Sequence, residues 1–175
     1  LGGLVRDLTA SEMLAQITTA QKDQNIRISN VVMMGMGEPL DNYDNVIKFL
    51  KLVSSPDNLN IGLRHISVST CGLVNGIDKL AKENLPITLS ISLHAYDNDV
   101  RSSIMPVNKK YGIEELLTAC SRYYDVTGRR ISFEYTMIDG VSDTEECAKK
   151  LAKLLKGFPC HVNLIPLNPV DERDL

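Results

Sequence analysis

The sequence alternates between short apolar runs and amphipathic stretches with helical spacing, and this order limits the chain to few folds. The apolar runs predict strands at residues 31–34, 65–70, 86–94, 130–137 and 161–166. The amphipathic stretches predict helices at residues 9–24, 45–53, 76–83, 113–124 and 144–156. Strands separated by helices of about 10–15 residues are typical of parallel βαβ units. The chain is therefore expected to be an α/β protein with parallel strands.

Polar residues inside the strands help to choose between two parallel architectures. Ser67 and Ser69 alternate with apolar residues in the second predicted strand, as do Thr88, Ser90 and Ser92 in the third. A doubly wound sheet is covered on both faces, and its strands read as nearly continuous apolar runs. Alternating polar residues suit a barrel with a hydrated interior. We therefore favour a partial (β/α) barrel over a doubly wound sheet, as a single domain of residues 1–175.

The composition is that of an ordinary globular protein. The 175 residues are 43% hydrophobic and 23% charged, with a formal net charge of -3. No apolar run approaches the ~18 residues that span a bilayer, so we predict no membrane segment. The weak negative charge argues against a general nucleic-acid coat, although an RNA enzyme could carry its basic surface elsewhere. The sequence does not begin with Met and both ends look cut, so we expect a fragment.

The cysteines are too far apart for a metal-knuckle spacing such as CxxC. They are Cys71, Cys120, Cys147 and Cys160. We interpret them as free thiols in a reducing compartment, which predicts a cytoplasmic protein.

Polar or glycine-rich sequence follows every predicted strand. The segments are residues 35–38, 69–72, 92–94, 139–140 and 168–169. In parallel α/β proteins ligands bind at the carboxyl ends of the strands, which meet at one edge of the sheet. The pattern therefore predicts a ligand site at this edge.

The first two strand ends offer candidates for binding an amino-acid-like ligand. Gly37 lets the backbone approach a ligand closely, and the Glu38 carboxylate could accept from a ligand ammonium group. The alternative is a turn whose glutamate is merely solvated. Ser69 could bind a ribose hydroxyl or a carboxylate, but strand serines more often bond neighbouring backbone.

The later strands supply three further polar candidates. Ser92 and His94 share one face of the third strand, and Leu93 takes the other. His94 could contact a ligand or be a buried histidine satisfied by protein groups. Asn163 lies mid-strand between apolar residues and is predicted to be buried, so that its amide needs a ligand or a neighbouring strand as partner.

The most basic stretch near this edge lies in the long connection after the third strand. It contains Arg101, Asn108, Lys109 and Lys110. These side chains could contact RNA phosphate, but a solvated loop is the favoured interpretation.

Taken together, these segments resemble the radical S-adenosylmethionine (SAM) adenine methyltransferases that act on ribosomal and transfer RNA. Residues 68–72 read VSTCG where that family has VSTSG, and residues 3–9 resemble the stretch after the family's cluster loop. The other segments that carry the resemblance are residues 35–40 (GMGEPL), 91–95 (ISLHA), 101–111 (RSSIMPVNKKY) and 163–169 (NLIPLNP). The similarity covers essentially the whole chain in order.

The resemblance implies a radical SAM barrel of which this chain lacks the first strand and the cluster loop. It implies that residues 37 and 38 bind the methionine part of SAM, and that polar residues at the ends of the later strands line the rest of the cofactor. The implied cofactor-binding residues are Gly37, Glu38, Ser69, Ser92, Leu93, His94 and Asn163.

The resemblance also implies the chemistry of the intact enzyme. The family methylates carbon 2 of an adenine in 23S rRNA and tRNA, with SAM, a 4Fe–4S cluster and an electron donor such as flavodoxin or ferredoxin. Its cluster cysteines are spaced CxxxCxxC, and that spacing is absent here, so we assign no metal ligand and no catalytic residue. The chain alone is expected to be inactive and to bind SAM weakly.

Three other readings stay open at this point. A sister enzyme could methylate carbon 8 of adenine with nearly the same motifs. A non-radical barrel aldolase would want a lysine at a strand end, and no predicted strand ends in one. An RNA-binding module would want a basic face, which the net charge does not supply.

Overall fold

Five parallel strands form the sheet that organises the protein, in a computed structural model that describes residues 4–167. The strands lie in sequence order, so each one pairs with the next. They are β1 (Val31–Met33), β2 (Ile66–Thr70), β3 (Thr88–Ser92), β4 (Ile131–Met137) and β5 (Cys160–Pro166). The helices are α1 (Ala10–Gln24), α2 (Tyr43–Ser54), α3 (Val74–Glu83), α4 (Asn98–Ile104), α5 (Ile113–Thr127) and α6 (Glu145–Leu154), with short 3-10 turns η1 (Leu63–His65) and η2 (Pro106–Lys109). The predicted alternation of helices and strands is confirmed.

Helix α1 begins where a capping box in the sequence places its start. Thr9 accepts a hydrogen bond from the Glu12 backbone N–H at 3.3 Å, and the Glu12 carboxylate accepts from the Thr9 N–H at 2.9 Å. Two backbone donors at the helix start are thereby satisfied by local side chains. Ile17 is buried on the face that turns toward the core.

Helix α4 lies in the connection that the sequence led us to expect as a loop. Asp97 caps it by accepting from the Val100 N–H at 2.9 Å. The helix has only seven residues, and its largest fully buried side chain is Arg101. The sequence of α4 therefore lacks the repeated apolar residues at helical spacing from which a helix is predicted.

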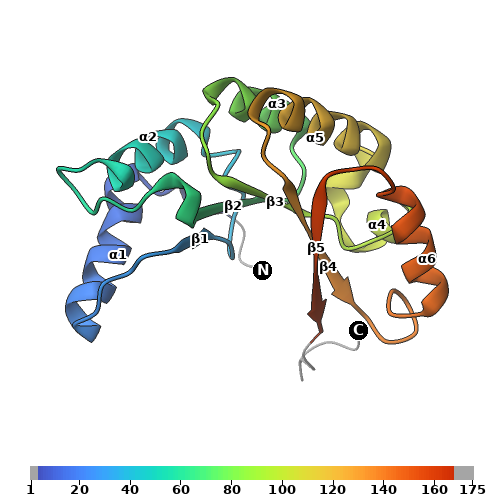
Figure 1. Cartoon of the computed structure of the whole chain (residues 1–175). Helices are drawn as coiled ribbons and strands as arrows, with labels where there is room; N and C mark the ends of the chain where they lie inside the picture. The colour runs from blue at the N-terminus through green and yellow to red at the C-terminus, as the bar shows by residue number, and fades with distance from the viewer. Residues whose placement is uncertain (1–3, 168–175) are drawn as a thin grey trace.

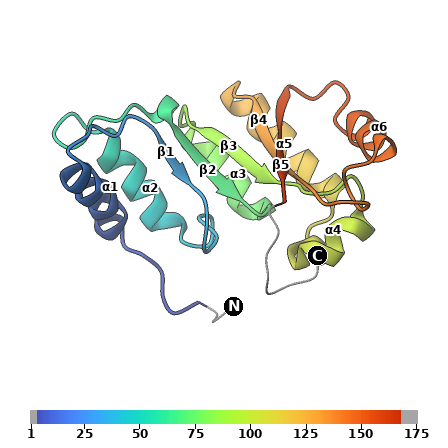
Figure 2. The ribbon, with the colours of Figure 1, turned by 90° about the horizontal axis from the view of Figure 1, so that it is seen from below.

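The helices follow the outer side of the curved sheet, and the apolar core lies between the two layers. Figure 1 shows the helices along an arc outside the strands, and Figure 2 shows the strands fanning out in one layer from β1 to β5. The core side chains of the sheet, which are at most 1% exposed, include Ile66, Val68, Leu89, Ile91 and Phe133. Because the helices cover one face, the sheet is a partial barrel and not a doubly wound sheet, as predicted. None of the helices within residues 4–167 is long and apolar enough to cross a membrane.

Candidate functional site

The uncovered face of the sheet carries the polar residues that alternate with the core. Strand pairing places Ser69, Ser90 and Ser132 side by side in one row. The next row toward the carboxyl ends is Ser92, Glu134 and Asn163. Paired residues of neighbouring strands point to the same face, so these rows form a continuous polar surface. Three of the predicted residues, on β2, β3 and β5, therefore share one face.

The turn after β1 is fastened to the end of β2 by Glu38. One carboxylate oxygen accepts from the Cys71 N–H at 2.7 Å, and the other accepts from the Leu40 N–H at 3.0 Å. The glutamate is therefore not simply solvated, because it joins two strand ends. A carboxylate has about four lone-pair sites, so it retains acceptor capacity for a ligand.

Gly37 in this turn is required by backbone conformation and not by lack of space. Its φ is +100°, in the region that favours glycine, yet a Cβ added there would meet no atom within 4 Å. The peptide groups on either side of Gly37 are thus open to close approach.

The serines of this edge differ from the neighbouring threonine in their hydrogen bonding. Thr70 accepts from the Gly72 N–H at 3.1 Å and serves the local turn. Ser67 and Ser90 bond each other at 2.9 Å across the sheet. Within the described residues, the hydroxyls of Ser69 and Ser92 have no hydrogen-bond partner. Both hydroxyls therefore stay available to a ligand at the carboxyl ends of β2 and β3.

Arg101 is buried, and both interpretations offered for it from the sequence are wrong. The side chain is 0% exposed, so it neither lies in a solvated loop nor faces RNA. Its guanidinium donates to the carbonyls of Cys71 at 2.7 Å, Ser92 at 3.0 Å and Leu93 at 3.1 Å, and to Asn108 Oδ1 at 3.0 Å. Burial lowers the pKa of Arg101 from its ordinary value, but a guanidinium remains charged in proteins. Arg101 therefore ties the end of β2 to the end of β3.

Other members of that basic stretch divide between burial and exposure. Asn108 is 5% exposed and donates to the Asn98 carbonyl and to Ser102, so it too was wrongly expected in a solvated loop. Lys109 and Lys110 are exposed, as a surface loop requires.

His94 follows β3 with an unusual backbone conformation and a defined tautomer. Its φ is 55°, and its Nδ1 accepts from the Thr136 backbone N–H at 3.2 Å. Because Nδ1 accepts, the proton of the neutral ring must sit on Nε2. Burial lowers the pKa of His94 below its ordinary value, and the charge of Arg101 adds to this effect. At neutral pH the ring is an uncharged group with one N–H donor. Thr136 satisfies Nδ1, and Nε2–H is the donor that could make the predicted ligand contact.

Asn163 is exposed, which corrects the prediction that it is buried. It lies on β5, an edge strand of the described sheet, and edge position was not visible in the sequence. Its amide Nδ2 donates to Glu134 Oε2 at 2.6 Å, so a neighbouring strand is its partner. The sequence analysis missed Glu134, which is only 4% exposed in the middle of β4. A lone carboxylate inside an otherwise strand-like run was the signal that could have found it.

The cysteines of this chain do not fit the ligand set of an iron–sulfur cluster. Burial raises the pKa of the Cys71 thiol to about 12, with the Glu38 carboxylate adding to the effect, and burial raises that of Cys120 to about 12. Cluster ligands are thiolates. Within residues 4–167 no three His, Cys, Asp or Glu side chains are grouped as a metal site would need.

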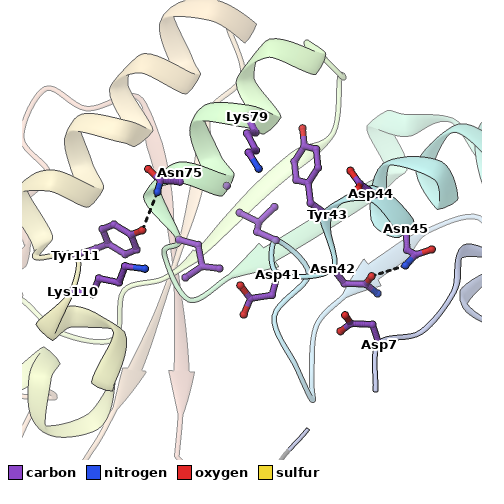
Figure 3. A pocket seen from close by; sticks show the side chains of 13 residues that line it. Asp7, Asp41, Asn42, Tyr43, Asp44, Asn45, Asn75, Lys79, Lys110 and Tyr111 are labelled. Atoms are coloured by element: carbon purple, nitrogen blue, oxygen red, sulfur yellow. Dashed lines mark hydrogen bonds between the residues drawn. The ribbon is translucent and has the colours of Figure 1, made fainter. Parts of the chain in front are cut away.

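Two cavities flank the strand edge. One, of about 880 Å³, has an apolar lining from α1 and β1 and is bordered by Gly37 and Glu38. The other, of about 570 Å³, is polar and lies near the starts of α2 and α3 (Figure 3). In Figure 3, Asn75 and Lys79 reach it from α3, and Tyr111 bonds Asn75 across one side at 3.3 Å. The predicted residues on β2, β3 and β5 line neither cavity, so the polar face of the sheet is a separate surface.

Comparison with known proteins agrees with this architecture. Residues 2–155 match the Radical SAM superfamily. The chain belongs to the radical SAM superfamily. Its fold also matches the crystal structure of a radical SAM methyltransferase from Sphaerobacter thermophilus, with a TM-score of 0.91 and 49% sequence identity over 95% of this chain and 50% of that one.

Curated relatives of this radical SAM chain carry a more specific name. The chain is 59% identical over 172 residues to the probable dual-specificity RNA methyltransferase RlmN of Clostridium acetobutylicum, which is 98% of this chain and 50% of the relative. It is 57% identical over 172 residues to the protein of the same name from Clostridium novyi, again 98% of this chain and 50% of the relative. The chain thus spans about half the length of the curated relatives it matches. Radical SAM methyltransferases use SAM with a 4Fe–4S cluster, and the family predicted from the sequence is confirmed.

The roles of individual residues stay predictions. Contacts connect the predicted residues along the strand ends, from the β1 turn through Arg101 to β3, and from β3 through Glu134 to β5. Asn168 and Pro169, which the sequence analysis placed at the last strand exit, lie outside the described residues.

Proposed function

We propose that the complete protein is a radical SAM RNA methyltransferase that methylates carbon 2 of an adenine in 23S rRNA and tRNA. The observation that carries this proposal is the 59% identity, over 98% of the chain, to a probable dual-specificity RNA methyltransferase. Ribosomal and transfer RNA would be its macromolecular partners, in the cytoplasm, with flavodoxin or ferredoxin as electron donor.

The chain's own residues fit the methionine end of SAM. Glu38 is held by two backbone N–H groups and keeps acceptor capacity for the cofactor's ammonium group. Gly37 leaves its peptide groups open beside it. A charge-assisted hydrogen bond from an ammonium to this carboxylate would orient the cofactor at the β1 end of the edge.

The later strands fit the nucleoside end. The hydroxyls of Ser69 and Ser92 can donate or accept, and the Nε2–H of His94 can donate, so they suit ribose hydroxyls and ring nitrogens. The Leu93 backbone and Asn163 complete this part of the site. When bound, SAM supplies the methyl group, and these residues hold it in one orientation and exclude water from that face.

The cluster ligands are proposed to come from polypeptide outside these 175 residues. The described cysteines do not supply the set, and two of them are held as thiols by burial. We therefore assign to this chain the binding and orientation of SAM, and no role in holding iron.

The test is methylation by the full-length protein, purified anaerobically with its cluster reconstituted. Incubation with SAM, a reducing system and unmodified 23S rRNA or tRNA should give 2-methyladenosine in nuclease digests analysed by mass spectrometry. The control is the full-length Glu38→Ala variant, which should lose most of this product because the ammonium partner is gone. Formation of 8-methyladenosine instead would replace the carbon-2 assignment, and methylation of neither RNA would refute the proposal.

A further inference from the structure

Glu134 forms hydrogen bonds with three of the predicted cofactor-binding residues, Leu93, His94 and Asn163. It lies in register between Ser92 on β3 and Asn163 on β5. Its backbone carbonyl accepts from the N–H groups of Leu93 at 3.1 Å and His94 at 3.0 Å. Its side chain accepts from Asn163. One residue of β4 therefore contacts the binding residues of both neighbouring strands.

The side chain of Glu134 determines which end of the Asn163 amide faces outward. An ionised carboxylate can only accept hydrogen bonds, whereas an amide has one donating end and one accepting end. Since Nδ2 of Asn163 lies 2.6 Å from Glu134 Oε2, the donating end points to β4. The accepting Oδ1 is left for a ligand. Without Glu134, the exposed amide could rotate between its two orientations, and part of its population would present the donating end instead of Oδ1.

The carboxylate is itself held in place. Its second oxygen accepts from the Ser132 hydroxyl at 3.1 Å, and the residue is 4% exposed. Within residues 4–167 it forms no ion pair with a lysine or arginine. Burying a carboxylate without a cation is costly, so a purely structural purpose is poorly served by this choice of residue.

We propose that Glu134 is a positioning residue of the cofactor site: it orients the Asn163 amide so that Oδ1 accepts from a donor of the nucleoside part of SAM. This inference rests on the proposed function and adds a residue that does not itself touch the cofactor. The donor recognised by Oδ1 is a ribose hydroxyl or the adenine amino group.

Two conservative variants disturb the orientation of the Asn163 amide in different ways. Glu134→Gln keeps the length of the side chain, but its amide can either accept from Asn163 or donate to it, because the Ser132 hydroxyl can serve either end of that amide. The Asn163 amide is then no longer held in one orientation. Glu134→Asp keeps the charge but is one methylene shorter, so the carboxylate no longer reaches Asn163. Ser132→Ala is the matched control, because it removes the other hydrogen bond of the same carboxylate.

The measurement is the dissociation constant for S-adenosylhomocysteine, by calorimetry on the full-length, cluster-reconstituted protein. Its sulfur is uncharged, so the lost charge of the Gln variant does not itself weaken binding. We expect Glu134→Asp to bind about tenfold more weakly, as for one lost hydrogen bond. Glu134→Gln should lose less than Glu134→Asp, because part of its population keeps the native amide orientation, and Ser132→Ala should stay within about threefold of wild type. In an Asn163→Ala background, Glu134→Asp should cause no further loss, because it acts through Asn163.

The outcomes are distinct. Equal binding by the Asp variant and wild type, a larger loss in Gln than in Asp, or additive losses in the double variant would each overturn the inference. Failure of the wild-type protein to bind S-adenosylhomocysteine at all would instead count against the proposed function.

Discussion

The β1 end and the β3–β4 end of the strand edge hold their polar groups by different means. At β1, an exposed glycine-rich turn is fastened by one half-buried carboxylate, which takes two backbone N–H groups. At β3 and β4, the fully buried Arg101 holds three strand-end carbonyls, and buried Glu134 contacts residues of both neighbouring strands. The turn can therefore adjust around a ligand at low cost, whereas the β3–β4 end is fixed before a ligand arrives.

The largest effect should come from breaking the rigid end. Arg101→Met leaves three carbonyls and Asn108 without their donor in a buried site. We expect the full-length protein to lose about 3–5 kcal/mol of unfolding free energy, measured by urea denaturation. The control is Arg122→Met, which removes an exposed ion pair with Asp78 and should cost far less than Arg101→Met. Equal losses of unfolding free energy in the two variants would show that the hydrogen bonds of Arg101 do not hold the strand ends together.

Substitutions at two glycines with similar backbone conformation should have effects of intermediate size on stability, one at each end of the strand edge. Gly37 and Gly72 have φ values of +100° and +106°, but only at Gly72 would a Cβ meet neighbours, at 3.1 Å from Leu116 and 3.3 Å from Arg101. Gly37→Ala should therefore cost about 1 kcal/mol for the backbone alone. Gly72→Ala should cost about 2–3 kcal/mol, because its methyl group also displaces the side chains of Leu116 and Arg101. Urea denaturation of both variants measures this, and a larger loss at Gly37 would reverse the assignment of the flexible end.

The smallest effect is a pH dependence carried by His94. Its folded-state pKa is lowered, so the unfolded chain binds a proton more readily than the folded one. Its contribution to stability is therefore complete above the unfolded value of about 6.5 and is lost as the pH falls through the folded pKa. The urea midpoint of the wild type should drop more between pH 7.5 and pH 5.5 than that of His94→Gln. Identical drops would mean that the imidazole is not buried in its neutral form.

The sequence could predict the scaffold because periodicity records which face of each element is buried. Alternating serines on β2 and β3 indicated a sheet covered on one side, and the capping box located the start of α1. The rest depended on neighbours distant in sequence. Arg101 is satisfied by carbonyls of two strands, and Asn163 is exposed because β5 lies at an edge. The spacing of nearby residues does not show which distant strands Arg101 contacts or that β5 lies at an edge, so the burial of Arg101 and of Asn163 was predicted wrongly.

The high pKa of Cys71 and Cys120 has a consequence for the chemical labelling of the protein. Alkylating reagents attack the thiolate, and burial keeps both of these groups almost wholly protonated at neutral pH. Brief iodoacetamide treatment of the native protein should therefore leave these two sites unmodified. Carbamidomethyl groups found by peptide mapping would then report on reactive sulfur other than that of Cys71 and Cys120, which stay silent in the native fold.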